Sequence, residues 1–291
     1  MKKLLSLSLV SAMLLGIFAC NKVNSPNTGT NPFGASINNT STSNVANPLD
    51  LVGNVPTSFT QKVVIEEFTG EWCGFCPDGA QILDQITSSN AGKIYGAAIH
   101  DKDWLEINPF YSQIKTLLPN TYGFPGATAN RKPYNGENIF GRGSWEAAAT
   151  QLLSQTPECG MALVSKEKND MLDLKVFVGY NAKVNKATKL TIYLLEDGIA
   201  HVNQSNATPN YKHNHVVREC FTTTLGDDIS LSDVGKKYTL KEFKNLDIAG
   251  KYKDKSKLHI LAFINTNGAD KNGHEILNAQ MVGLNETKKW D

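Results

Sequence analysis

The sequence predicts an α/β domain followed by an all-β sandwich domain. Between residues 58 and 156, strand and helix patterns alternate, which favours layers built around a mainly parallel sheet. From residue 157 onward, short apolar runs are separated by Asn, Asp and Gly turn clusters, which is typical of a β-sandwich. Residues 1–57 carry neither pattern, so the two folded domains are expected at 58–156 and 157–291.

The first twenty residues resemble a lipoprotein signal peptide. Two lysines precede an apolar run over residues 4–18, and Ile17-Phe18-Ala19-Cys20 is similar to a lipobox that ends on the modified cysteine. The run is shorter than the roughly twenty residues that a bilayer core requires, which argues against a transmembrane anchor. The resemblance implies a bacterial lipoprotein whose mature chain starts at Cys20 and is held to the membrane by lipid.

Residues 21–57 predict a disordered tether. They are mostly Asn, Ser, Thr, Gly and Pro, and they cannot bury enough apolar surface to offset the loss of chain entropy. No acidic cluster follows Cys20, and some Gram-negative lipoproteins use such a cluster for surface display. We therefore expect the periplasmic face of the outer membrane rather than the cell surface.

Composition allows two cores and gives little information about partners. The chain has 291 residues, of which 41% are hydrophobic, and its formal net charge is +1. That length suffices for two domains, and the near-zero charge gives no indication of nucleic-acid binding. Neither charge nor composition calls for a cofactor.

Each element of the α/β domain has its own pattern. Lys62 to Phe68 is apolar and β-branched enough for a buried strand, and residues 94–100 repeat that pattern. The expected order is strand 62–68, helix 78–87, strand 94–100, helix 109–118, strand 126–130 and helix 144–153.

A C-x-x-C pair stands between the first strand and the first helix. Unsatisfied N–H groups and the positive end of the helix dipole favour a thiolate at this place, so Cys73 is the expected nucleophile. Cys76 lies one turn further in and is the expected resolving thiol. A structural disulfide and half of a zinc site remain alternatives, although no second C-x-x-C or Cys/His cluster completes a zinc site.

The residues around the pair resemble the active-site segment of the thioredoxin superfamily, from Glu67 to Cys76. In that superfamily an acidic residue six positions before the first cysteine helps to move a proton to and from the resolving cysteine. The resemblance implies that role and a raised pKa for Glu67. The alternative is a strand-end glutamate that points into solvent.

The same resemblance implies a cis-proline facing the cysteines. Pro125, in Gly123-Phe124-Pro125-Gly126, is the candidate, and the Phe124 carbonyl would then pair with substrate backbone. A competing register places Thr128 there and leaves Pro125 an ordinary turn proline. Trp72, Phe75 and Phe124 are the expected substrate-binding side chains. The closing strand pair of the fold falls on residues 132–140, where Pro133 and Gly136 predict a short or irregular hairpin.

The second domain is expected to be an immunoglobulin-like sandwich without convincing helices. Its strands are predicted at 160–166, 172–180, 189–195, 215–223, 237–240, 258–265 and 275–282. Cys159 and Cys220 are candidates for a structural disulfide in this domain, with two free thiols as the alternative.

His213 and His215 are weak candidates for metal ligands. Strand alternation would place both on one side, where a third ligand from elsewhere could complete a site. No convergent third ligand is evident, so we favour histidines that hydrogen-bond a loop and predict no bound metal. Arg218 is expected to be a structural ion-pair partner.

The motifs together resemble the thioredoxin-fold outer-membrane lipoproteins typified by a twenty-eight-kilodalton outer membrane protein. The residues that carry the resemblance are Glu66 to Gly70, Trp72 to Pro77, the Gly-x-Pro turn ending at Asn130-Arg131, and His213 to Arg218. The resemblance implies a two-domain, lipid-anchored envelope protein, and it supports architecture more than activity.

These observations predict an envelope thiol–disulfide oxidoreductase that acts on protein disulfides or dithiols, with no assigned redox direction. The rival is a non-catalytic binding or adhesion lipoprotein with a structural Cys73–Cys76 disulfide. Exposure of the Cys73 sulfur beside the Gly123–Gly126 turn favours exchange, and burial under the tether or the sandwich favours the rival. A homodimer formed through the sandwich remains open.

Overall fold

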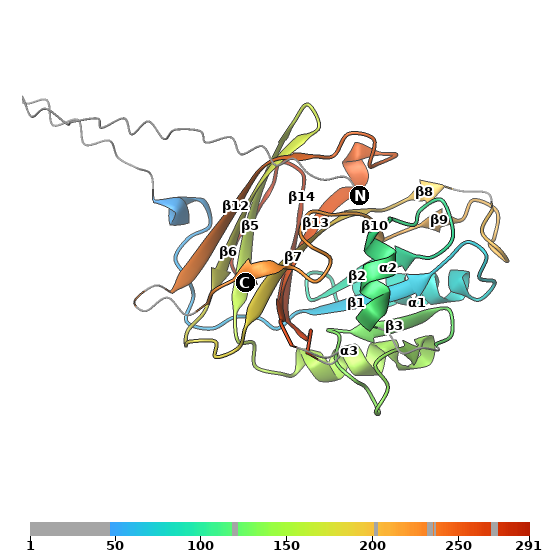
Figure 1. The fold of residues 1–291 in the computed structure, drawn as a ribbon, viewed down its shortest axis with the longest axis horizontal. Helices are drawn as coiled ribbons and strands as arrows, with labels where there is room; N and C mark the ends of the chain where they lie inside the picture. Colours follow the sequence, from blue (N-terminus) through green and yellow to red (C-terminus); the bar gives the residue numbers. More distant parts are fainter. Residues whose placement is uncertain (1–46, 118–121, 201–202, 232–234, 236, 269–272) are drawn as a thin grey trace, which may run out of the picture. The chain divides into compact units, whose positions relative to one another are not determined.

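A nine-stranded mixed sheet forms the centre of the computed structural model, which describes residues 47–117, 122–200, 203–231, 235, 237–268 and 273–291. Its strand order is β14-β13-β7-β10-β2-β1-β3-β4, and β11 pairs with β7 (Figure 1). These strands are β1 (Val63–Thr69), β2 (Ile94–His100), β3 (Gly126–Ala129), β4 (Phe140–Gly141), β7 (Thr188–Glu196), β10 (Val216–Cys220), β11 (Asp227–Ile229), β13 (Leu258–Thr266) and β14 (Ile276–Gly283).

A second sheet of four strands has the order β12-β6-β5-β15, and a two-stranded hairpin pairs β8 with β9. Their bounds are β5 (Gly160–Lys168), β6 (Met171–Gly179), β8 (Ile199–Ala200), β9 (Lys212–His213), β12 (Tyr238–Asp247) and β15 (Thr287–Lys288). The four-stranded sheet packs against β7 and β13 through a shared apolar core that includes Leu174, Ile192 and Ile260.

Within the described ranges, three α-helices cover the part of the main sheet that contains β1. They are α1 (Cys76–Ser89), α2 (Phe110–Ile114) and α3 (Trp145–Leu153), and the 3-10 turns are η1 (Pro48–Leu51), η2 (Lys115–Leu117), η3 (Arg142–Ser144) and η4 (Lys255–Lys257). Side chains alternate along β1: Ile65 packs with α1 and α3, whereas Val64 packs with α2. Helices α1 and α3 therefore cover one face of the sheet and α2 covers the other.

The main sheet crosses the boundary expected at residue 156. Strand β2 from the first half pairs in parallel with β10 from the second, through Val216 and Ala98. The Ala98 N–H also donates to the His215 carbonyl at 2.7 Å. The described residues from 47 onward accordingly form one compact unit, and the division into a thioredoxin-like domain and a separate immunoglobulin-like sandwich stays a prediction.

The folded unit begins earlier than expected. Residues 47–57 were assigned to the tether, but Val52 is buried in a cluster with Ala162, Val164 and Phe177. The Trp290 indole N–H donates to the Gly53 carbonyl at 3.0 Å, which fixes this segment on the four-stranded sheet. The predicted signal peptide, Cys20 and tether residues 21–46 lie outside the described residues. No helix among the described residues is both long and apolar enough to cross a membrane.

Cys159 and Cys220 do not form the candidate disulfide, and the alternative of two free thiols holds. Cys159 is buried in the core between the two sheets, whereas Cys220 packs against the cluster that contains α2. Those two clusters lie on opposite faces of the main sheet, since Leu194 of β7 points into the first and Leu195 into the second. The sheet itself keeps the two sulfur atoms apart.

Candidate functional site

The Cys73–Cys76 pair is a disulfide at the junction of β1 and α1, with 5.4 Å between the two Cα atoms. Helix α1 starts at Cys76, with Phe75 as its N-cap and Pro77 in its first turn. The Cys76 N–H donates to the Cys73 carbonyl at 3.2 Å, so the pair closes one tight turn. This is the strand, pair and helix order that the sequence predicts, except that the helix begins at Cys76 rather than at residue 78.

The two cysteines are buried but their neighbours are not. Cys73 is 4% and Cys76 1% exposed, whereas Trp72 is 49% and Phe75 67% exposed. The Trp72 ring lies 4.9 Å from the Phe124 ring, and its indole N–H donates to the Asp101 carbonyl at 2.8 Å. The three side chains expected to bind substrate therefore flank the disulfide, and two of them present large apolar surface to solvent.

The Phe124–Pro125 peptide bond is cis, as expected from the resemblance to the thioredoxin superfamily. Pro125 packs on α1 at Gly79, where an added Cβ atom would come within 2.7 Å of the Pro125 Cγ. Thr128 lies in β3 with its backbone opposite Glu66 rather than in the cis turn, so the competing register does not hold.

Glu67 lies beneath the same turn of α1. Its Oε1 atom would be 3.0 Å from a Cβ atom added at Gly79. Gly79 follows Cys76 by three residues, so both lie on the same side of α1. The carboxyl group is buried, and burial, assisted by the charge of Asp84, raises its pKa to about 8. Among the described residues, Oε1 has no hydrogen-bond partner. The solvent-facing alternative for Glu67 is therefore wrong.

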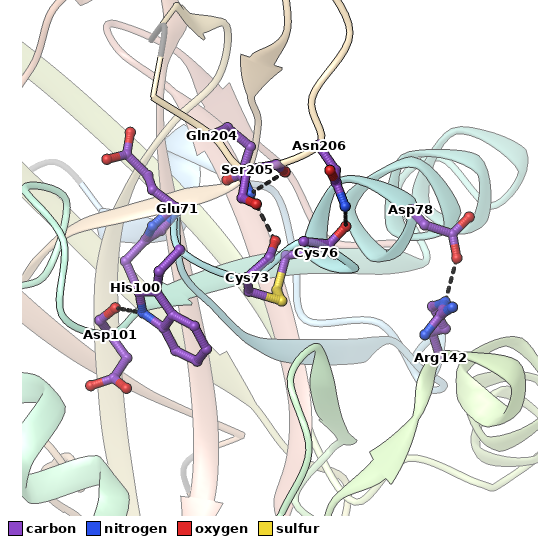
Figure 2. The surroundings of a disulfide bond; sticks show 12 residues. Glu71, Cys73, Cys76, Asp78, His100, Asp101, Arg142, Gln204, Ser205 and Asn206 are labelled. Carbon is purple, nitrogen blue, oxygen red and sulfur yellow. Dashed lines mark hydrogen bonds and ion pairs between the residues drawn. A yellow bond between two sulfur atoms is a disulfide. The ribbon is translucent and has the colours of Figure 1, made fainter.

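A loop from the second half of the chain contacts the C-x-x-C segment, a feature that the sequence analysis missed. The Gln204 side chain donates from Nε2 to the Cys73 carbonyl at 3.0 Å, and Asn206 donates from Nδ2 to the Gly74 carbonyl at 3.3 Å. The Ser205 N–H donates to the Glu71 carbonyl at 2.8 Å. Figure 2 shows these three residues along one side of the segment, with the sulfur directed away from them. A short polar run in a loop carries no pattern that predicts such contacts.

A polar network supports the segment from behind. The Trp104 indole N–H donates to Glu71 Oε1 at 2.8 Å, and the Glu71 N–H donates to Asp103 Oδ2 at 2.9 Å. The same Asp103 oxygen contacts His100 Nδ1 at 2.7 Å. Burial acts to raise the pKa of Asp103, but the His100 contact and the backbone hydrogen bonds from Glu71 and Leu105 together lower it. The loop after β2 thus holds the backbone that precedes Cys73.

His213 and His215 do not share a metal site. His213 packs edge-on against the His100 ring at 5.1 Å, whereas His215 Nε2 lies 3.1 Å from Asp84 Oδ1 on α1. His215 has a left-handed backbone with φ 58°, which breaks the alternation on which the shared site depended. No group of three or more His, Cys, Asp or Glu side chains within the described ranges is arranged to hold a metal.

Arg218 has the structural role expected for it. Its Nε atom lies 3.4 Å from Oε2 of the buried Glu196 and also donates to the Lys251 carbonyl at 2.9 Å. Its guanidinium group lies over the Trp104 ring, 5.9 Å from the centroid. These contacts tie β7 and β10 to the loop after β2.

Two solved structures share much of this fold. HBP35 of Porphyromonas gingivalis superposes with a TM-score of 0.67 at 23% identity, over 80% of this chain and 78% of that chain. A structural-genomics target protein of Agrobacterium tumefaciens superposes with a TM-score of 0.53 at 17% identity, over 79% of this chain and 97% of that chain. At these identities the similarity concerns the fold alone. Comparison with the curated proteins gives no match.

The family comparison covers most of the second half and the end of the first. The family model described as outer membrane protein Omp28 matches residues 115–288. That range includes Pro125, β3, the Gln204–Asn206 loop and β10, the strand by which the second half joins the main sheet, whereas β1, β2 and the two cysteines precede it. The chain therefore belongs to the Omp28 family of outer membrane proteins.

Proposed function

We propose that this protein is an envelope thiol–disulfide oxidoreductase that acts on protein disulfides or dithiols through Cys73 and Cys76. The single observation that carries the proposal is the carboxyl group of Glu67. It is buried beneath the helix that carries Cys76, its Oε1 atom has no hydrogen-bond partner among the described residues, and burial raises its pKa to about 8. A fold-locking disulfide has no need of a buried titrating carboxyl group beside it.

The surroundings of the pair support a thioredoxin-like site. Strand β1 lies between parallel β2 and antiparallel β3, the cysteines follow β1, and the cis Pro125 packs on α1 near them. Such a turn leaves the Phe124 carbonyl as a candidate acceptor for substrate backbone. Trp72 and Phe75 offer the apolar surface on which a substrate chain would lie.

The proposed chemistry is a pair of sulfur displacements. In the reduced protein, the Cys73 thiolate attacks one sulfur of a substrate disulfide, and the other substrate sulfur leaves as a thiolate. In the fraction of molecules in which Glu67 is ionised, its carboxylate accepts the Cys76 proton. The Cys76 thiolate then attacks Cys73 Sγ, which closes the disulfide and releases the second substrate sulfur, so that the substrate ends as a dithiol. The same steps run in reverse when the partner is a dithiol, since relative potentials set the direction.

The alternative is a non-catalytic binding lipoprotein with a structural Cys73–Cys76 disulfide. One observation favours it: both cysteines are almost completely buried, and residues 204–206 of the second half contact their backbone. Burial of Cys73 under the second half is the condition that favours this reading. We rank exchange first because the contacts from residues 204–206 reach carbonyl oxygens, whereas the sulfur is directed to the other side (Figure 2).

The proposal for localisation builds on the family, whose members are outer membrane proteins. We propose lipid attachment at Cys20 and display on the periplasmic face. The lipobox-like Ile17-Phe18-Ala19-Cys20 and the absence of an acidic cluster after it in the sequence support this placement.

A turnover assay separates the two functions. The purified mature chain is mixed with glutathione disulfide and a reduced dithiol peptide, and peptide oxidation is followed with time. Exchange predicts turnover that Cys73→Ser abolishes, and Cys76→Ser should accumulate a mixed disulfide on Cys73. The binding alternative predicts no turnover and a loss of about 2–4 kcal/mol of stability in either variant. Cys220→Ser is the matched control, because that thiol lies on another face of the sheet.

A further inference from the structure

We propose that Gln204, Ser205 and Asn206, here called the cap, determine which substrates reach the disulfide. The cap closes one side of the Cys73–Cys76 segment, so the accessible partner is a small thiol or an extended chain with apolar residues beside its cysteines. A folded protein that presents a rigid dithiol is excluded. The inference rests on the proposed exchange function and assigns its substrate class.

The cap makes three consecutive contacts with the reacting segment. Gln204 donates to the Cys73 carbonyl at 3.0 Å, the Ser205 N–H to the Glu71 carbonyl at 2.8 Å, and Asn206 to the Gly74 carbonyl at 3.3 Å. Gln204 is itself buried, and its Nε2 atom also reaches the Ser205 carbonyl at 3.3 Å. With these three carbonyls occupied, the cap leaves no room for another chain on that side of the segment (Figure 2).

The loop that carries the cap is held in shape by its own backbone. The Ala207 N–H donates to the Gln204 carbonyl at 3.3 Å, and the Tyr211 N–H donates to the Thr208 carbonyl at 3.1 Å. Asn206 has a left-handed backbone with φ 56°, which asparagine tolerates better than most residues. At the base, His213 in β9 pairs with Ile199 in β8 and is buried against His100. The cap is therefore a fixed wall in this structure.

Gly74 explains how the wall comes so close. A Cβ atom added at Gly74 would lie 2.8 Å from the Asn206 Nδ2 atom and 3.5 Å from the Ser205 Oγ atom. Gly74, the first residue between the cysteines, thus has no side chain at the point where the cap contacts it. The second, Phe75, points its ring outward and lies under the Arg142 guanidinium at 5.7 Å.

The side that the cap leaves open is aromatic. Trp72 and Phe75 are the most exposed large apolar side chains next to the disulfide, and Phe124 continues this surface from Trp72 toward Pro125. An extended chain can lay its apolar side chains on these rings while its backbone runs beside the Phe124–Pro125 turn. A folded domain would have to approach over the cap as well, where it meets Asn206.

The step that tests access is reduction of the protein disulfide by a dithiol. One substrate thiolate attacks Cys73 Sγ, the Cys73–Cys76 bond breaks, and Cys76 leaves as a thiolate that is protonated through Glu67. The second substrate thiolate then displaces Cys73. The substrate ends as a disulfide and the protein as a dithiol, so both electrons are accounted for.

The experiment compares three reductants on the oxidised mature chain by acid quench and alkylation. The probes are dithiothreitol, an unstructured peptide with two cysteines flanked by leucines, and a reduced, folded thioredoxin domain. For the native chain we expect the peptide to react faster than the folded domain. In Gln204→Ala/Asn206→Ala the rate with the folded domain should rise about tenfold, while the rates with the peptide and dithiothreitol stay within about twofold.

Thr208→Ala is the matched control, because it lies in the same loop, is exposed and lies outside the cap. It should leave all three rates unchanged. Asn206→Ala alone, which retains the buried Gln204, is the second variant, and near-ultraviolet circular dichroism verifies that each variant is folded. The Asn206→Ala variant should raise the rate with the folded domain, as the double variant does.

Four results would overturn the inference. In the first, the native chain reacts as fast with the folded domain as with the peptide. In the second, the cap variants leave the ratio of the folded-domain rate to the peptide rate unchanged. In the third, the cap variants raise all three rates together, which would indicate altered positioning of the cysteines rather than altered access. If dithiothreitol reduces the disulfide normally in these cases, the proposed function survives and the cap alone fails. In the fourth result, none of the three probes reduces the disulfide of the native chain, which would contradict both the exchange function and the role of the cap.

Discussion

Glu66 and Glu67 are neighbours on β1, and their carboxyl groups lie on opposite faces of the sheet in different surroundings. Glu66 accepts hydrogen bonds from Arg131 at 2.7 and 2.8 Å and from the Tyr193 hydroxyl at 2.9 Å. Glu67 lies under α1, where its Oε1 atom accepts none from the described residues. The charge of Glu66 is thus balanced by Arg131 within the core, whereas Glu67 keeps a proton that it can exchange beside the cysteines.

Glu67→Gln should abolish a pH dependence of stability. The folded chain holds the Glu67 proton up to about pH 8, whereas the unfolded chain releases it near the ordinary value of 4.5. The native state therefore binds more protons between those values, and the free energy of unfolding should fall by up to about 4–5 kcal/mol as the pH rises through that window. Urea unfolding of the oxidised chain at pH 5 and pH 8 measures this difference.

The glutamine variant should show little of that difference and should be more stable than the native chain at pH 8. Glu146→Gln, on the exposed side of α3, is the control and should behave as the native chain does. An unchanged pH dependence in Glu67→Gln would show that another group is responsible.

Arg131→Met should be strongly destabilising because it leaves the Glu66 carboxylate buried without its cation. Both side chains are almost completely buried, and loss of one partner of such a pair costs about 3–5 kcal/mol. The double variant Glu66→Leu/Arg131→Met should cost clearly less than the single change, since no uncompensated charge remains. Chemical denaturation of the single and double variants measures the coupling, and strictly additive effects would contradict it.

Gly79→Ala should destabilise the protein, although alanine normally stabilises a helix relative to glycine by about 1 kcal/mol. The added Cβ atom would meet Pro125 Cγ at 2.7 Å and Cβ at 2.9 Å, and overpacking of this kind costs about 1–3 kcal/mol. Gln85→Ala, at an exposed position of the same helix, is the control and should be neutral. Thermal unfolding measures both, and a stabilised Gly79→Ala variant would show that Pro125 does not pack closely on α1.

Cys20→Ser should release the protein from the membrane. With the lipid acceptor removed, the chain should take up no labelled palmitate and should fractionate with soluble envelope proteins. Cys73→Ser keeps the lipobox-like segment and should be labelled and membrane-bound like the native chain. Equal labelling of Cys20→Ser would show that the anchor lies elsewhere.

Much of the fold was predictable because its strands carry strong local patterns. The apolar runs at β1, β2, β7 and β13 predict buried strands, and the structure places strands there within one residue of the expected bounds. Strand β4 has only two residues, in agreement with the short hairpin expected from Pro133 and Gly136. The helix expected at 109–118 is shorter, since α2 ends at Ile114 and continues as the 3-10 turn η2.

The continuity of the main sheet was not predictable. It depends on the single register pair of Val216 with Ala98, and edge pairing between distant strands leaves no periodicity in the sequence. The separation of His213 from His215 was missed for a similar reason, because alternation assumes an unbroken strand and His215 has a positive φ. Glu67, Cys73 and Cys76 were accessible to sequence reasoning because they form a dense local motif, and Pro125 was found only through the thioredoxin resemblance. Gln204 joins them from 131 residues away in a loop without any such pattern.

The most direct test of the exchange function is the reduction potential of the Cys73–Cys76 pair. The soluble chain lacking residues 1–20 is equilibrated in thiol–disulfide buffers and alkylated, and Cys159 and Cys220 are quantified separately. An exchange-competent disulfide is expected at a potential above about −270 mV. A potential well below about −300 mV would mark a disulfide that resists exchange, and it would contradict the oxidoreductase function in favour of the binding lipoprotein.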